Sequence, residues 1–245
     1  MRTSPIVVLT AMMASVVVGA RAADNAKDFN GVWQAFATAP AISRSASAGT
    51  FTAEGEIKLA DFAARYPNMI EPGSYCAPAG MPSTMTSLSS RAIDITQTPT
   101  RISLLAAMEN QYRRIYLDER DYPENHPLTR QGYSIGHWDG DTLVIETRLL
   151  DEMLTGHFPR TENTLVVERI SKMKRDQVTA PVSGSLSTST IDDNVLAFNL
   201  TVTDPTLYAK PQVVTVYYQH IDDNAMPEYD CTATLWQQAL DEANP

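Results

Sequence analysis

The sequence is poor in cysteine, in positive charge and in long apolar runs, and each shortage excludes a class of protein. Its 2 cysteines cannot by themselves build a structural zinc site. With 19 Lys and Arg against 29 Asp and Glu, it lacks the clustered positive charge that binds phosphate backbones, so we expect no nucleic-acid partner. No glycine-rich phosphate loop follows a predicted strand, and no H-E-x-x-H occurs.

The longest apolar run lies at the N-terminus and has the features of an export signal. Arg2 gives a positive start, and Ile6–Ala20 is apolar but too short to span a bilayer comfortably. Ala20-Arg21-Ala22 supplies the small residues of a cleavage site. We predict a signal peptide over residues 1–22 and one β-barrel-like domain over residues 23–245. The alternative is a membrane anchor. No later stretch can span a membrane, so we expect a periplasmic or secreted bacterial protein.

The cysteines, Cys76 and Cys231, lie far apart in the sequence. An oxidising compartment and an even cysteine count favour a disulfide between them. The alternative is two buried, unpaired thiols.

Strand patterns dominate the sequence from Ala92 onward, and one helix is expected near the front, over Thr52–Arg65, with Thr52 as its cap. Sequential hairpins favour antiparallel neighbours, and a sheet of roughly ten twisted strands tends to curl or close. We therefore expect a mainly β fold, an antiparallel meander that closes into a barrel, in preference to a two-sheet sandwich. The predicted strands are Asp28–Ala37, Ala92–Gln97, Arg101–Met108, Tyr112–Asp118, Ser134–Trp138, Thr142–Leu150, Thr164–Lys174, Ser185–Ile191, Val195–Val202 and Val213–His220.

A stripe of polar side chains runs along one predicted strand and its end. Alternate residues of a strand share a face, so these side chains either line a cavity or form a solvated or ion-paired face. We expect the cavity. There, Arg114 and Arg120 can each hold an anion in bidentate fashion. The members of the stripe are Tyr112, Arg114, Tyr116, Asp118 and Arg120.

The same stripe contains a candidate acid/base set that needs no cofactor. Asp118 beside two arginines should stay ionised, and His137 can move a proton near neutral pH. Asp118, with Tyr116 or His137, is therefore the predicted catalytic group if the protein is an enzyme. No serine has a persuasive nucleophile context.

The hairpin around Asp139-Gly140 is expected to add a second wall to the cavity. Pairing about that turn places Tyr133, His137 and Glu146 on one mixed face and Trp138 on the more apolar one. We predict Tyr112, Arg114, Arg120, Tyr133, Trp138 and Glu146 as ligand-binding residues. The spacing of His137, Asp139 and Asp141 lacks the pattern of a metal motif, so we expect no metal.

Two long motifs carry a family resemblance. They are C-x-P-x-G-M-P at Cys76–Pro82 and G-x-S-x-G-x-W-x-G-D-T-L-V at Gly132–Val144. With Arg114–Arg120 and Glu228–Cys231, they resemble a family of exported, functionally uncharacterised bacterial proteins. The resemblance runs from about residue 31 to residue 231 and implies no known chemistry.

The chain departs from the family pattern in two places, and its start has a second likeness. Glu119 stands where glycine is common, which puts the tight turn there in doubt. His137 stands where arginine is frequent, which argues against a histidine catalyst for the family. Gly31-x-Trp33 resembles the opening of lipocalin-type barrels and agrees with the expected barrel.

These observations leave three hypotheses open. The first is an exported barrel that binds a small apolar or aromatic, anionic molecule in its cavity. The second is a cofactor-independent lyase, isomerase or hydratase that uses the same cavity. The third is an interaction protein without a pocket.

Overall fold

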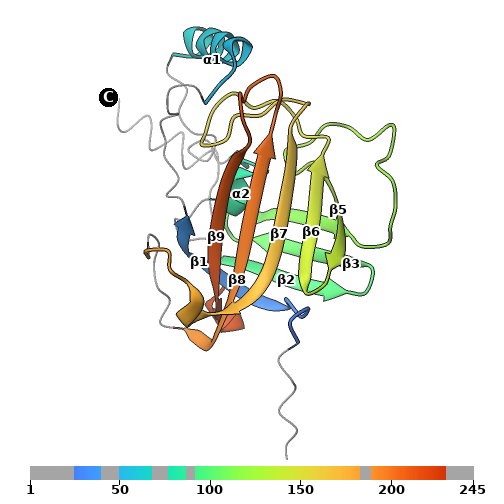
Figure 1. Ribbon diagram of the computed structural model, residues 1–245, viewed down its shortest axis with the longest axis vertical. Helices are drawn as coiled ribbons and strands as arrows, with labels where there is room; N and C mark the ends of the chain where they lie inside the picture. The colour runs from blue at the N-terminus through green and yellow to red at the C-terminus, as the bar shows by residue number, and fades with distance from the viewer. Residues whose placement is uncertain (1–24, 40–49, 68–76, 87–91, 183–188, 230–245) are drawn as a thin grey trace, which may run out of the picture.

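The structure is a computed structural model that describes residues 25–39, 50–67, 77–86, 92–182 and 189–229. In these ranges, nine strands pair in chain order and the first pairs with the last, which closes a barrel (Figure 1). The predicted mainly β barrel is confirmed. The strands are β1 (Gly31–Ala39), β2 (Ala92–Thr98), β3 (Arg101–Ala106), β4 (Gln111–Tyr116), β5 (Tyr133–Asp139), β6 (Thr142–Arg148), β7 (Leu165–Lys174), β8 (Thr190–Thr203) and β9 (Gln212–Ile221).

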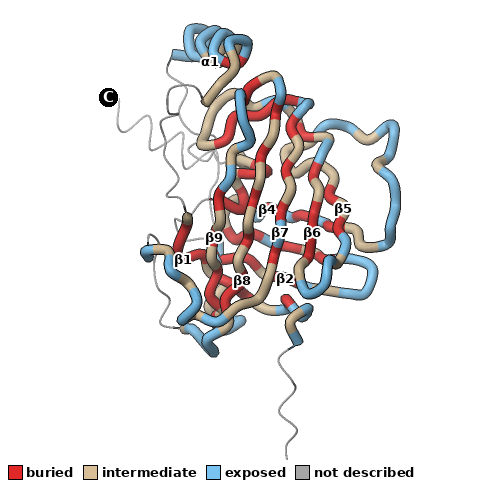
Figure 2. Tube along the Cα trace, viewed as in Figure 1, coloured by how far each residue is buried: buried red, intermediate tan, exposed pale blue. Residues whose placement is uncertain are grey.

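In the described ranges, two α-helices accompany the barrel, α1 (Ala53–Arg65) and the short α2 (Ser83–Thr86). The predicted cap of α1 is confirmed, because the Gly55 amide donates to Thr52 Oγ1 at 2.9 Å. Only Gly55 of α1 is buried, and it rests against Leu207. The helix therefore stands at one end of the barrel with most of its surface in solvent (Figure 2).

One strand pair breaks the antiparallel meander. β4 and β5 run parallel and share two residue pairs, Ile115 with Ser134 and Tyr116 with Ile135. A parallel neighbour needs a crossover, and residues 117–132 provide it. We call this junction the β4–β5 seam. It has the fewest paired residues of any neighbouring strands in the described barrel.

Two predicted turns are corrected. In the β5–β6 hairpin, Asp139 pairs with Thr142, so the loop is Gly140-Asp141 and not Asp139-Gly140. Of these residues, Gly140 has a positive φ, of 60°, which suits the first loop position of a type II′ turn. Each residue of β5 therefore pairs with a residue of β6 two positions further along than predicted. Because a shift of two residues preserves the alternation, every side chain keeps its predicted face. The predicted turn at Asp192–Asn194 is instead an irregular stretch inside the continuous strand β8.

The barrel interior is filled by side chains. Alternate residues of the strands point inward and form one buried apolar cluster that includes Trp33, Phe198, Leu200 and Tyr218. Figure 2 shows the same alternation as buried and less buried positions along the strands. The interior described here is a packed core, which corrects the expectation of a ligand cavity at this place.

Part of this core comes from residues 77–86, which we call the plug segment. Met81 and Met85 of this segment are fully buried in the main apolar cluster. Tyr218 on β9 donates from its hydroxyl to the Met85 carbonyl at 2.9 Å, and α2 lies behind β9 in Figure 1. Buried Arg160 donates from Nη1 to the Ala79 carbonyl at 2.8 Å. Within the described chain, the C-x-P-x-G-M-P motif thus supplies part of the barrel core.

A buried carboxylate, Asp204, organises the turn between β8 and β9. It accepts hydrogen bonds from the hydroxyls of Thr161 and Thr164 and from the amides of Thr206 and Leu207. Burial alone would raise the pKa of Asp204. The bonds from Thr164 and Thr161 outweigh burial, and the pKa of Asp204 lies below its ordinary value.

We expect Asp204→Asn to lower the free energy of unfolding by about 2 kcal/mol near neutral pH, because buried donors lose their ionised acceptor. The folded pKa is depressed, so the stabilisation is complete above the unfolded pKa of about 3.9. It is lost as the pH falls through the lower folded pKa. Urea unfolding of both proteins at about pH 7 and about pH 2.5 should show the difference shrinking in acid. A difference that is constant with pH would contradict this assignment.

Several features predicted from the sequence fall on residues that the structure does not describe. The predicted signal peptide and both cysteines of the predicted disulfide, Cys76 and Cys231, lie outside the described residues. Among the helices in the described ranges, none has the length and apolar character needed to span a bilayer.

Candidate functional site

The polar stripe of β4 faces outward, not into the barrel. Gln111, Arg113 and Ile115 are the buried, inward residues of this strand, whereas Tyr112 and Arg114 are exposed. The stripe residues do share one face of β4, as predicted, but this face is turned to solvent and not to the interior of the barrel. Both faces of β4 carry an arginine, so periodicity could not decide which face points inward.

The outward residues form a continuous layer over the seam. The Arg120 guanidinium lies 3.8 Å from the centroid of the Tyr116 ring, and Tyr116 stacks on Tyr133 with centroids 5.0 Å apart. Arg120 also pairs with both carboxylate oxygens of Asp118 and donates to the Tyr133 hydroxyl at 3.4 Å. Since Tyr116 is on β4 and Tyr133 on β5, the layer fastens the seam from outside.

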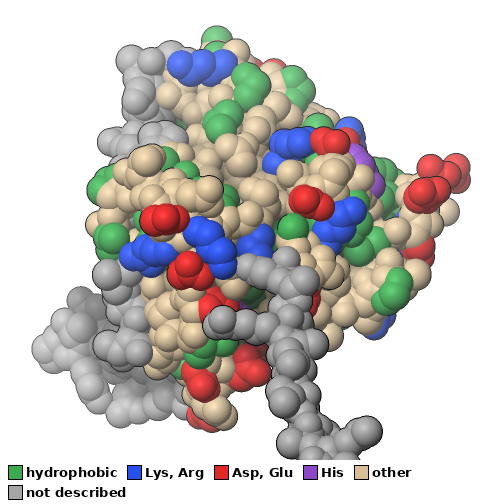
Figure 3. Space-filling model, turned by 60° about the horizontal axis from the view of Figure 1, so that its bottom comes forward, with side chains coloured by type: hydrophobic (Ala, Val, Ile, Leu, Met, Phe, Trp, Pro, Cys, Tyr) green, Lys and Arg blue, Asp and Glu red, His purple; other side chains and the backbone are tan. Residues whose placement is uncertain are grey.

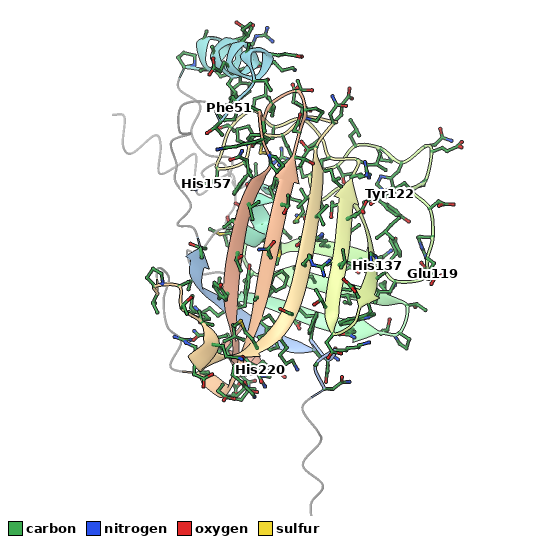
Figure 4. All side chains as sticks on the ribbon, in the orientation of Figure 1. Phe51, Glu119, Tyr122, His137, His157 and His220 are labelled. Atoms are coloured by element: carbon green, nitrogen blue, oxygen red, sulfur yellow. The ribbon has the colours of Figure 1, made fainter. Side chains whose placement is uncertain are left out.

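The candidate acid/base residues are not gathered around a cavity. The hydrogen bond from Arg120 holds the pKa of the Asp118 carboxyl below its ordinary value, which makes it a weak base. Tyr116 has Arg120 near one side and Tyr133 stacked on it. His137 is exposed on the outer face of β5, and Figure 4 places it, Tyr122 and Glu119 on the side of the barrel away from His157. A catalytic role for this set stays a prediction.

The predicted hairpin wall is also outside. Tyr133, His137 and Glu146 share the outer face of β5 and β6, and the Glu146 carboxylate lies 3.5 Å from Arg148. Trp138 points inward, where it packs on Phe29 with ring centroids 5.3 Å apart. Of the predicted ligand-binding residues, Arg114 lacks a carboxylate partner in the described chain; its guanidinium donates to the hydroxyls of Tyr112 and Tyr116.

A buried ion pair that the sequence reasoning missed fastens the seam from inside. Arg113 on β4 donates from Nη1 to Glu168 Oε1 at 3.0 Å and from Nη2 to Oε2, with side-chain exposures of 1% and 0%. Arg113 also donates to Ser134 on β5 at 3.1 Å and to Thr147 on β6 at 2.7 Å. Glu168 is on β7, so one network joins four neighbouring strands. The sequence did contain a sign of this ion pair, because Glu168 lies between Val166 and Ile170 on the otherwise apolar face of β7.

The G-x-S-x-G letters at Gly132–Gly136 have a structural explanation. Ser134 is buried in the middle of the ion-pair network, and its Oγ lies 2.9 Å from Thr147 Oγ1. Gly136 lies against β4, because a Cβ there would come 3.1 Å from Ile115. A nucleophile elbow needs an exposed serine on a turn between a strand and a helix, and Ser134 has neither feature.

A pocket of about 360 Å³ lies where the seam opens toward the start of β4. It is lined by Pro78 of the plug segment, by residues 109–112 and by residues 129–131. We call it the rim pocket. Its volume falls in the usual range for small-molecule sites. From the predicted ligand-binding set, it contains Tyr112.

A hydrogen-bonded cluster fixes the floor of the rim pocket. Gln111 Oε1 accepts from the Gly80 amide at 2.9 Å, from Thr84 at 2.8 Å and from Gln131 Nε2 at 2.7 Å. Because a backbone amide can only donate, this arrangement also fixes which end of each side-chain amide is oxygen. Glu109 lies beside this cluster, where it accepts from Gln111 Nε2 at 3.0 Å. The polar groups at the floor of the pocket are therefore held in defined orientations.

The chain bends after β4 although no glycine stands there. Glu119 has a φ of 55°, in the left-handed region that favours glycine. We expect Glu119→Gly to raise the free energy of unfolding by about 0.5–1 kcal/mol, because relief of strain exceeds the added entropy of the unfolded chain. Urea unfolding can measure this gain. Glu124→Gly, an exposed change in the same loop, is the control and should not stabilise; an equal gain from both would contradict the strain at Glu119.

Positive and negative side chains are mixed on the face of the molecule shown in Figure 3. On the described part of the face in Figure 3, Lys and Arg lie beside Asp and Glu and form no broad surface of one sign. Within the residues that the structure covers, no three His, Cys, Asp or Glu side chains converge as a metal site would require.

Comparisons with known proteins identify no relative by sequence. No protein-family model matches the chain, and no curated protein matches it significantly. Membership of the family with the C-x-P-x-G-M-P motif therefore stays a prediction. Among solved structures, the chain is similar to a "secretary abundant heat soluble (SAHS) protein" from Ramazzottius varieornatus. The identity is 9%, the match covers 78% of this chain and 94% of that chain, and the TM-score is 0.33. A score this low carries no argument, so the barrel rests on its own strand pairing.

Proposed function

We propose that this protein is an exported binding protein that takes a small aromatic anion in the rim pocket. The observation that carries the proposal is the pocket itself, a hollow of about 360 Å³ between β4 and residues 129–131. Among the described residues, the side chains that point into the barrel form a buried apolar cluster, so we place the ligand in the rim pocket and not in the interior. Export is inferred from the N-terminal sequence alone.

The lining of the rim pocket suits an aromatic acid. Tyr112 contributes an aromatic ring that is 48% exposed, and Arg130, also in the lining, contributes a guanidinium. Aromatic rings favour stacked or edge-on aromatic partners, and guanidinium groups bind carboxylates through paired hydrogen bonds. The ligand class is the one predicted from the sequence, with Arg130 in the role that the sequence assigned to Arg114 and Arg120.

The proposal is tested by titrating 3-phenylpropionate into the protein and into Tyr112→Ala. We expect saturable binding to the unmodified protein and about tenfold weaker binding to Tyr112→Ala, because the ring contact is lost. Tyr66→Ala, at the C-cap of α1, is the matched control, since Tyr66 is 45% exposed and is not part of the pocket lining. Equal weakening in both variants, or no binding to the unmodified protein, would contradict the proposal.

A further inference from the structure

Two opposite charges line the rim pocket, and each has an unused hydrogen-bonding position. The Glu109 carboxylate accepts through Oε2 from the Ala79 amide and from Gln111 Nε2, both at 3.0 Å. In the part of the chain that the structure describes, nothing bonds its other oxygen, Oε1. One carboxylate oxygen is thus held in place by the protein, and the second is available to a donor.

Arg130 has the complementary arrangement. Its Nη1 donates to the Pro78 carbonyl at 2.6 Å, which fixes the guanidinium against the plug segment. Its Nε is 3.9 Å from Asp151, whose other oxygen pairs with Arg160 at 2.5 Å. Within the described ranges, Nη2 of Arg130 has no partner. The guanidinium therefore keeps a donor for an anionic group.

The backbone beside Glu109 is strained. Glu109 and Asn110 have φ values of 60° and 47°, so two consecutive residues other than glycine occupy the left-handed region. Such residues cost free energy and persist where the surrounding contacts enforce them, which occurs often at ligand sites. Here the enforcing contacts include those of the Glu109 side chain with Ala79 and Gln111.

We infer that the rim pocket binds a zwitterion of the amino-acid type, with an aromatic side chain. This inference rests on the proposed function and adds a second charge to the ligand. The ligand carboxylate meets Arg130, its ammonium meets Glu109 Oε1, and its ring contacts Tyr112. Arg130 Nη2 and Glu109 Oε1 then both have a charged partner, which a ligand with one charge cannot supply.

The inference is tested with three ligands that differ by one charge at a time: L-phenylalanine, 3-phenylpropionate without the ammonium, and phenethylamine without the carboxylate. On the unmodified protein, L-phenylalanine should bind about tenfold more tightly than either analogue. This comparison involves no substitution, so it does not depend on the folding of a variant.

The variant Glu109→Gln tests the role of the Glu109 charge. Its amide oxygen can still accept from Ala79 and Gln111, but the negative charge is gone. This variant should remove the preference for L-phenylalanine over 3-phenylpropionate, because the ammonium loses its partner and the anionic analogue no longer binds beside a second carboxylate. Glu124→Gln, an exposed acid outside the pocket, should keep the preference.

The outcomes separate the two claims. If 3-phenylpropionate binds as tightly as L-phenylalanine, the zwitterion inference is wrong and the proposed aromatic-anion site stands. If phenethylamine alone binds, both claims are wrong, because the ligand needs no anion. Absence of binding by all three ligands overturns both as well.

Discussion

Arg113→Met should lower the free energy of unfolding by about 3–5 kcal/mol, because it leaves the Glu168 carboxylate buried without its counter-charge. The two side chains are almost wholly inaccessible to solvent, and Arg113 also satisfies Ser134 and Thr147. Removal of one partner thus affects a network that spans β4 to β7. Chemical denaturation by urea, followed by circular dichroism, measures the loss.

The double variant Arg113→Met with Glu168→Leu tests the cause. Buried ion pairs replaced by apolar residues of similar volume often cost little, so the double variant should be more stable than Arg113→Met alone. If the two changes cost the sum of their separate effects, the loss comes from packing and not from an unpaired charge. That result would contradict the role given to the network.

Gly80→Ala should cost about 3 kcal/mol of stability and loosen the plug segment. Gly80 has a φ of 70°, and a Cβ there would lie 2.2 Å from the backbone oxygen of Arg130. That oxygen cannot retreat freely, because it accepts from the Met81 amide at 2.8 Å. The expected cost therefore combines the left-handed backbone with a steric clash.

Gly140→Ala is the control for this experiment. Gly140 has a similar φ of 60°, but nothing lies within 4 Å of a Cβ built there. Its substitution should cost only the conformational term, about 1 kcal/mol. Thermal and urea unfolding of the two variants would then differ by the clash alone. Equal losses would mean that the plug segment does not press on Arg130.

The seam links the stability of the barrel to its candidate site. Inside, Arg113 ties β4 to its neighbours, and outside, Arg120 and Tyr133 cover the junction. The plug segment contacts Arg130 and Gln111, two residues that line the rim pocket. The short parallel pair of β4 and β5 is thus stabilised by contacts on its inner and its outer face. The rim pocket, which we assign to the ligand, lies where these two strands separate.

The sequence allowed the fold class and the side-chain alternation to be predicted, because strand periodicity and turn residues are local signals. It did not allow the inside of β4 to be distinguished from the outside. Arg113 and Arg114 are equally charged, and the choice depends on Glu168, which is distant in the sequence and lies three strands away on β7.

The parallel pairing of β4 with β5 also could not be predicted from local sequence patterns. Residues 117–132 look like an ordinary loop, and only the closed strand order reveals that they cross over. For the same reason, the rim pocket was not predicted. Its walls come from Pro78, Glu109 and Arg130, which are brought together by the plug segment and not by spacing. Tyr112 was identified from the sequence because it belongs to the exposed stripe.

A ligand site at the rim of the barrel is tested most directly by a chemical-shift map of the amides while 3-phenylpropionate is titrated into the isotope-labelled protein. The largest shifts should occur at Tyr112, Arg130 and Gln131, which line the rim pocket, and inward residues such as Phe198 and Leu200 should be unaffected. Shifts concentrated on the inward residues of β7 to β9 would show that the ligand enters the barrel, and they would contradict a filled interior with its site at the rim.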